Sequence, residues 1–196
     1  MPIDVYLEVA PRRTFACAVD WPGWCRSGKN PEAALEALAV YADRYRAVVP
    51  KLPKRIALEV VEELQGDATT DFGAPSKACS LDDRPLTKAQ AGKLADIVAA
   101  SWKALDRVAA GAPATLRKGP RGGGRDRDAI VDHVADADGA YFRSTGLKGA
   151  TRDEFVAALR AARQPQSDGK WLWRYAARRV AWHALDHVWE IEDKSD

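Results

Sequence analysis

The pattern of apolar residues changes near residue 85, and this change constrains the fold more than any other feature of the chain. Before it, residues 4–9 alternate polar and apolar positions, as a half-buried β-strand does, and residues 14–19 form a second predicted strand. After it, the sequence is rich in alanine, and its apolar residues recur every three or four positions, as in amphipathic helices. We therefore expect an α+β protein, with a small β–α module over residues 1–84 and a helical part over residues 85–196.

Within the β–α module, one helix and one further strand are predicted. Asn30 is a suitable helix cap, Pro31 favours the first helical position, and the apolar spacing continues to about residue 48. Residues 55–64 are predicted as another strand. Residues 65–85 contain many turn-forming residues and are expected to be a linker and turn region.

The helical part is predicted to form an antiparallel four-helix bundle. Its helices are expected over residues 86–111, 126–143, 151–164 and 171–193. Thr151 and Glu154 have the spacing of a capping box at the start of the third helix. The basic, glycine-rich residues 116–124 lack the G-K-[ST] of a phosphate-binding loop, so they favour a flexible loop over a site for a small anion.

Composition argues against several classes of protein. The chain has 30 Lys and Arg against 28 Asp and Glu, a balance that argues against a nucleic-acid partner. The chain has an odd number of cysteines, three, and none of them has C-x-x-C spacing. This argues against a disulfide framework and favours the reducing cytoplasm as the location of the protein. We expect no membrane partner, because no stretch approaches the roughly 20 apolar residues of a spanning helix.

The three histidines are the strongest functional signal. His183 and His187 are four residues apart on the last predicted helix, so their side chains lie on one face. His133 lies on the second predicted helix, which can face the same interior. Three imidazoles that converge in this way can hold a divalent metal and leave coordination positions open. The alternative is that they are hydrogen-bonded core residues.

Four further residues are candidates for catalysis. Glu190 and Asp136 each lie one turn from a histidine and can orient an imidazole, act as a base or simply be surface charges. We favour the orienting role for Asp136 and leave Glu190 open. Arg179 can hold a substrate carboxylate or pair with a neighbouring helix. Tyr141 can donate a hydrogen bond into a pocket or be part of the core.

Two segments of the helical part resemble a known family. Residues 130–143, with His133, and residues 178–187, with His183 and His187, are similar to helices of the DinB-like superfamily. The resemblance covers roughly residues 86–193. It implies a four-helix bundle, commonly dimeric, in which the three histidines bind zinc, nickel or manganese. It also implies a small-molecule substrate and thiol transfer, isomerisation or hydrolysis, with a low-molecular-weight thiol as a further cofactor.

The β–α module has its own, shorter resemblance. Residues 20–25, Gly28 and residues 32–35 are similar to the strand–turn–helix segment of HicB-type antitoxins, which bind a protein partner. Two functions are therefore open: a metal-dependent enzyme, or a non-catalytic protein that binds a metal or a partner.

Trp182 and Trp189 form a second apolar stripe on the last helix, which predicts that this helix is covered on two sides.

Overall fold

A computed structural model describes residues 2–119 and 123–195 and confirms the α+β class. The N-terminal part is a mixed four-stranded sheet in the order β3-β2-β1-β4, in which β1 and β4 are parallel and the other pairs antiparallel. The strands are β1 (Ile3–Val9), β2 (Thr14–Ala18), β3 (Cys25–Gly28) and β4 (Leu58–Gln65). β3 was not predicted, since four residues are too few for a clear alternation. It follows a turn at Gly23, where φ is 87°.

The helix predicted over residues 31–48 is two helices, α1 (Pro31–Val40) and α2 (Ala42–Val48). Asn30 caps α1 as expected, accepting a hydrogen bond from the Ala33 backbone at 2.9 Å. The chain turns at Tyr41. The Trp24 indole donates a hydrogen bond to the Leu38 carbonyl at 2.9 Å. In a continuous helix, that carbonyl would accept a hydrogen bond from the backbone N–H four residues later. A tertiary contact therefore accompanies the break, and sequence periodicity does not detect it.

Residues 65–85, expected as a linker and turn region, are irregular over much of their length, but they are packed on the sheet and include two short helices. This segment contains α3 (Ala68–Phe72) and the short 3-10 helix η1 (Ser80–Asp83). Its anchor is Glu8 of β1, whose buried carboxylate accepts hydrogen bonds from the backbone of Ser76 and Lys77 and from the Thr70 hydroxyl. A buried carboxylate needs such donors, so the segment is held against the sheet.

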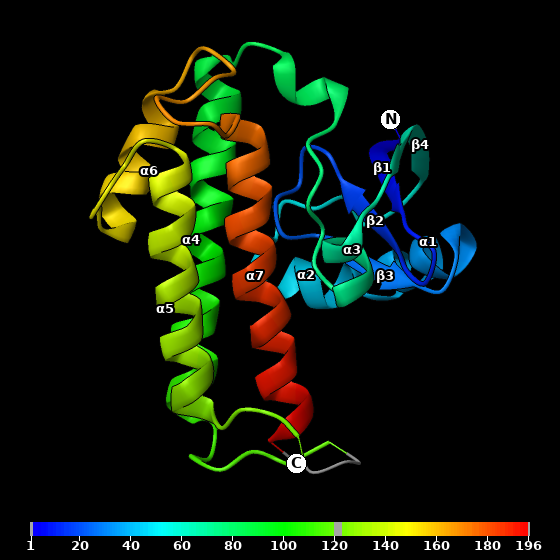
Figure 1. The fold of residues 1–196 in the computed structure, drawn as a ribbon, viewed down its shortest axis with the longest axis vertical. Helices are drawn as coiled ribbons and strands as arrows, with labels where there is room; N and C mark the ends of the chain where they lie inside the picture. The colour runs from blue at the N-terminus through cyan, green and yellow to red at the C-terminus, as the bar shows by residue number, and fades with distance from the viewer. Residues whose placement is uncertain (1, 120–122, 196) are drawn as a thin grey trace.

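The helical part consists of four helices that pack together, α4 (Lys88–Gly111), α5 (Arg127–Ser144), α6 (Arg152–Ala161) and α7 (Trp173–Lys194) (Figure 1). The capping box predicted at Thr151 and Glu154 is present. α6 is the shortest of the four and packs against α4. No helix in the described ranges has both the length and the apolar character needed to cross a bilayer.

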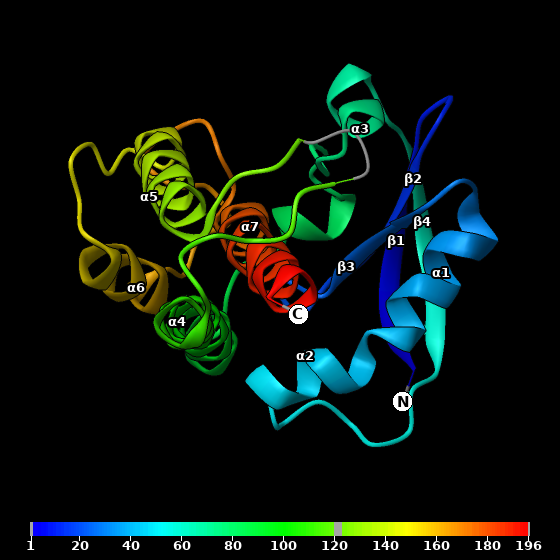
Figure 2. The same cartoon turned by 90° about the horizontal axis from the view of Figure 1, so that it is seen from below.

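α7 is the common core of the protein. Figure 2 shows it between helices α4–α6 on one side and the sheet with α1 and α2 on the other. Fifteen of its 22 residues are buried. Trp182 packs edge-on against Phe15 of β2, and Trp189 against Tyr41, with ring centroids 6.1 and 4.9 Å apart. The prediction that this helix is covered twice is confirmed, and the N-terminal part supplies the second cover.

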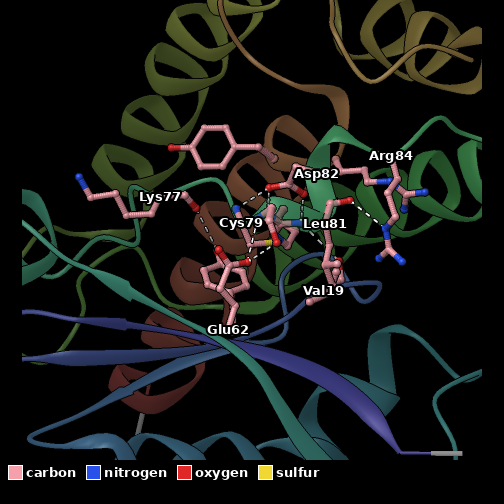
Figure 3. Close-up of polar contacts among 12 residues, drawn as sticks. Val19, Glu62, Lys77, Cys79, Leu81, Asp82 and Arg84 are labelled. Carbon is pink, nitrogen blue, oxygen red and sulfur yellow. Dashed lines mark hydrogen bonds and ion pairs between the residues drawn. The ribbon is translucent and has the colours of Figure 1, made fainter.

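A buried ion pair joins α7 to the N-terminal part. Arg178 donates two hydrogen bonds to the Asp82 carboxylate of η1, at 2.6 and 2.5 Å, and both residues are almost fully buried. Asp82 also accepts a hydrogen bond from the backbone of Cys79 at 2.9 Å, and Figure 3 shows this contact. The fork of a guanidinium matches both oxygens of a carboxylate, so the pair fixes the relative position of η1 and α7.

The division at residue 84 stays a prediction. The largest apolar cluster contains residues from both sides of it, with Val5 and Leu38 packed in the same core as Leu105 and Leu185. A side chain at Gly23 would lie 2.7 Å from Leu185, so this turn needs glycine to approach α7.

Removal of Asp82 will destabilise the protein strongly. The substitution Asp82→Ala leaves the Arg178 charge buried without a partner, which costs about 3–5 kcal/mol in the free energy of unfolding. The measurement is urea-induced unfolding followed by circular dichroism.

The matched control for this substitution is Asp96→Ala, which breaks the exposed pair between Asp96 and Arg160. We expect that change to cost no more than about 1 kcal/mol. Equal losses in the two variants would contradict the importance assigned to the buried pair.

Candidate metal centre

The three histidines of the chain converge between α5 and α7. His133 comes from α5, His183 and His187 come from α7, and one ring nitrogen of each lies within 4.8 Å of the others. His183 and His187 are buried, with exposed fractions of 7% and 8%, and His133 is half-buried. The predicted cluster is therefore present.

Local packing explains this convergence. Ile130 and Val134 of α5 are fully buried and flank His133 on its helix. On α7, Val180 and Ala184 are fully buried beside His183. α5 packs against α7, and the rings of His133 and His183 meet with centroids 4.9 Å apart. The imidazoles are thus held by apolar contacts on both helices.

The separations of the imidazoles suit a shared ligand. Nε2 of His183 and Nε2 of His133 are 3.2 Å apart, and the three ring centroids lie 4.8 to 5.2 Å from one another. With metal–nitrogen bonds of about 2.1 Å, tetrahedral ligand nitrogens lie about 3.4 Å apart. Without a metal, the 3.2 Å contact is a hydrogen bond between neutral rings.

Glu190 orients His187. Its carboxylate lies 2.6 Å from Nδ1 of His187 and accepts a hydrogen bond from Lys194 at 2.5 Å. These partners lower the pKa of Glu190 to about 2, so the group stays a carboxylate. A carboxylate on Nδ1 fixes the proton there and leaves Nε2 free for a metal, as in many metal sites. The contacts match the orienting role among those considered for Glu190.

The cluster favours neutral imidazoles. Burial, and then the neighbouring His187 and His133, lower the pKa of His183 to about 3. Burial and the nearby Arg125 also lower the pKa of His133. Since a metal binds the unprotonated ring, these two side chains are in the ligand form at neutral pH.

The other candidate residues differ in their surroundings. The Tyr141 ring lies 5.7 Å from the His183 ring, at the edge of the cluster. Arg179 is next to it, with its guanidinium carbon 5.3 Å from the centre of the Tyr141 ring. Asp136 is exposed and makes no hydrogen bond with another described residue. The catalytic roles of all four candidates stay predictions.

Sequence reasoning missed Lys194. Lys194 lies four residues after Glu190, a spacing at which opposite charges meet on a helix, so that pair was detectable. Trp171 lies beside Tyr141, with ring centroids 5.3 Å apart. Of the glycine-rich segment, residues 120–122 lie outside the described residues, and Lys118 pairs with Asp126 at the start of α5.

No family model, curated protein or solved structure matches this chain. The site therefore has to be interpreted from its own geometry, and the two resemblances stay expectations.

Loss of the Glu190 carboxylate will weaken metal binding. The substitution Glu190→Ala removes the acceptor that orients His187, and such partners contribute about 10- to 100-fold to metal affinity. The measurement is a competition titration against a zinc-chelating dye. Glu192→Ala is the control, because Glu192 pairs with Arg44 and, in the described structure, is hydrogen-bonded to none of the histidines. Equal affinities of the two variants would contradict the role given to Glu190.

The metal-free protein will lose stability as the pH decreases, partly because of His183. Its pKa is about 3 in the folded protein and about 6.5 when unfolded. Below pH 6.5 the unfolded chain therefore binds a proton that the folded chain does not, and the free energy of unfolding decreases. We expect a shallower decrease between pH 6.5 and 4.5 in His183→Gln, measured by urea unfolding with a chelator present. Parallel curves for the two proteins would show that His183 is not the cause.

Proposed function

We propose that the chain binds one divalent transition-metal ion through His133, His183 and His187, and that it is a metal-dependent enzyme acting on a small molecule. The observation that carries this proposal is the convergence of three imidazoles, from two helices, within 4.8 Å. The chain has three histidines in total. Chance clustering of all of them is a weaker explanation, because each also lies on the inner side of its helix.

The donor set indicates which metals suit the site. Three imidazole nitrogens favour zinc or nickel, whereas manganese prefers oxygen donors. Glu190 is engaged by His187 and Lys194, so it does not offer a free oxygen to the metal. Of the three expected metals, zinc and nickel therefore fit the site better than manganese.

The number of ligands supports an enzyme over a purely structural site. Within the described ranges, no fourth histidine, cysteine, aspartate or glutamate joins the cluster. Structural zinc sites have four protein ligands, whereas catalytic sites keep a position open for substrate. A divalent ion held by three neutral imidazoles keeps its charge and supplies a Lewis acid. The reaction class rests on the DinB-like resemblance, which implies thiol transfer, isomerisation or hydrolysis.

Ala184 argues against protease-like chemistry. In the zinc proteases with the H-E-x-x-H motif, a glutamate follows the first histidine and acts as the general base. Here Ala184 holds that position in the sequence and is fully buried. We therefore propose a small-molecule substrate and not a polypeptide.

Metal content is the direct test. Protein without a histidine tag will contain or take up about one zinc or nickel ion per chain, and His133→Ala will lose it. The measurement is elemental mass spectrometry after dialysis, with calorimetric titration of the metal-free protein. Because all three histidines lie in the site, their ring signals in nuclear magnetic resonance report on binding without interference from other histidines.

Asp132→Ala is the matched control, since Asp132 is an exposed neighbour of His133 on α5. It will bind metal like the unmodified protein. If neither protein binds zinc, nickel or manganese, the cluster is a hydrogen-bonded histidine group and the proposed enzyme is wrong.

A further inference from the structure

We propose that Arg179 binds an anionic group of the ligand that occupies the open position of the metal centre. The inference rests on the proposed function and adds the substrate class: a small anion, such as a carboxylate, that carries a metal-binding atom a few bonds away.

Of three arginines in one stretch of α7, Arg179 is the one without an ion-pair partner in the part of the chain that the structure describes. Arg174 pairs with Asp20 at 3.2 Å, and Arg178 pairs with Asp82 at 2.5 Å. Arg179 is half-buried and has no hydrogen-bond or ion-pair partner among the residues that the structure describes. The alternative role considered for it, a pair with a neighbouring helix, is not observed within those residues. Its charge is therefore available to a ligand.

Two aromatic rings hold the Arg179 guanidinium in place. Its central carbon lies 5.3 Å from the centre of the Tyr141 ring on α5 and 4.7 Å from that of Trp182 on α7. Stacking of this kind stabilises a cation and restricts its motion, but it leaves the N–H groups in the plane without acceptors. One of them, Nη1, is shielded from solvent and has no hydrogen-bond partner among the described residues. A buried donor without an acceptor costs free energy, which a bound anion would recover.

The position of Arg179 relates it to the histidines. It lies four residues before His183, so the two side chains are on the same face of α7 and about one turn, or 5.4 Å, apart along the helix. The Tyr141 ring contacts both, since its centre is 5.7 Å from that of His183. A ligand that binds the metal at one end would therefore need only a short spacer to reach the guanidinium.

The charges around the site favour an anion. The carboxylate of Glu190 is already shared by His187 and Lys194. With a divalent ion on neutral imidazoles, the centre and Arg179 together are strongly positive. The Tyr141 hydroxyl makes no hydrogen bond with another described residue, and its ring lies beside His183, so it is a second candidate donor to the ligand.

The test uses protein loaded with cobalt, whose absorption spectrum reports on new ligands. Two thiols of matched size are titrated: 3-mercaptopropionate, which carries a carboxylate, and the neutral 3-mercaptopropanamide. The unmodified protein will bind the carboxylate form more tightly. In Arg179→Gln this preference will fall by about 10- to 100-fold, as expected for loss of a charged hydrogen bond, while the affinity for the amide stays the same.

Arg143→Gln is the control, because Arg143 is an exposed residue of α5. It will keep the preference. Arg179→Lys retains the charge without the planar fork and will keep part of the preference, which guards against a folding defect in the glutamine variant.

Three outcomes would overturn the inference. An unchanged preference in Arg179→Gln means that Arg179 does not bind the anion. Equal weakening for both thiols means that it only supports the structure of the site. If the unmodified protein does not bind cobalt, the proposed function has failed and the inference falls with it, and the cobalt titration distinguishes this case from the other two.

Discussion

A helix that is buried on almost every side determines the rest of this structure. α7 has no broad face for solvent, so its charged side chains need partners inside the protein. Arg174 and Arg178 find them in Asp20 and Asp82, which both belong to the N-terminal part. The sheet and the segment that follows it therefore do more than cover apolar surface, because they neutralise charges that the helical part alone would leave buried.

The same constraint positions the candidate site. One side of α7 is fixed against the sheet by the ion pairs and by Trp182 and Trp189, which leaves its histidines on the side that meets α5. Arg179 lies between these two sides. Its neighbour in sequence, Arg178, points into the interface with the N-terminal part, whereas Arg179 is stacked on Tyr141 of α5. Successive residues of a helix are rotated by about 100°, so adjacent arginines point in different directions: Arg178 pairs with a carboxylate, whereas Arg179 lies against aromatic rings.

What the sequence predicts well here is local. Asn30, Thr151 and the spacing of His183 and His187 each act within one helical turn, and the helix caps and the histidine face follow from them. The break at Tyr41, the short β3 and the bond between Arg178 and Asp82 depend on residues far apart in the chain, which no local pattern encodes. Arg179 is the clearest case in the site, since only the folded structure distinguishes an arginine with a carboxylate partner from one without.

The place of α7 in the chain has a consequence for synthesis. A ribosome releases the strands, α1 and helices α4–α6 before residues 173–194, yet all three apolar clusters of the described structure contain residues of α7. Growing chains add about 5 to 20 residues per second, so the nascent protein exposes these surfaces for seconds before it can close them. During that interval the face of the sheet that α7 later covers and the open face of α4 are suitable targets for chaperones, and completion of α7 ends their exposure.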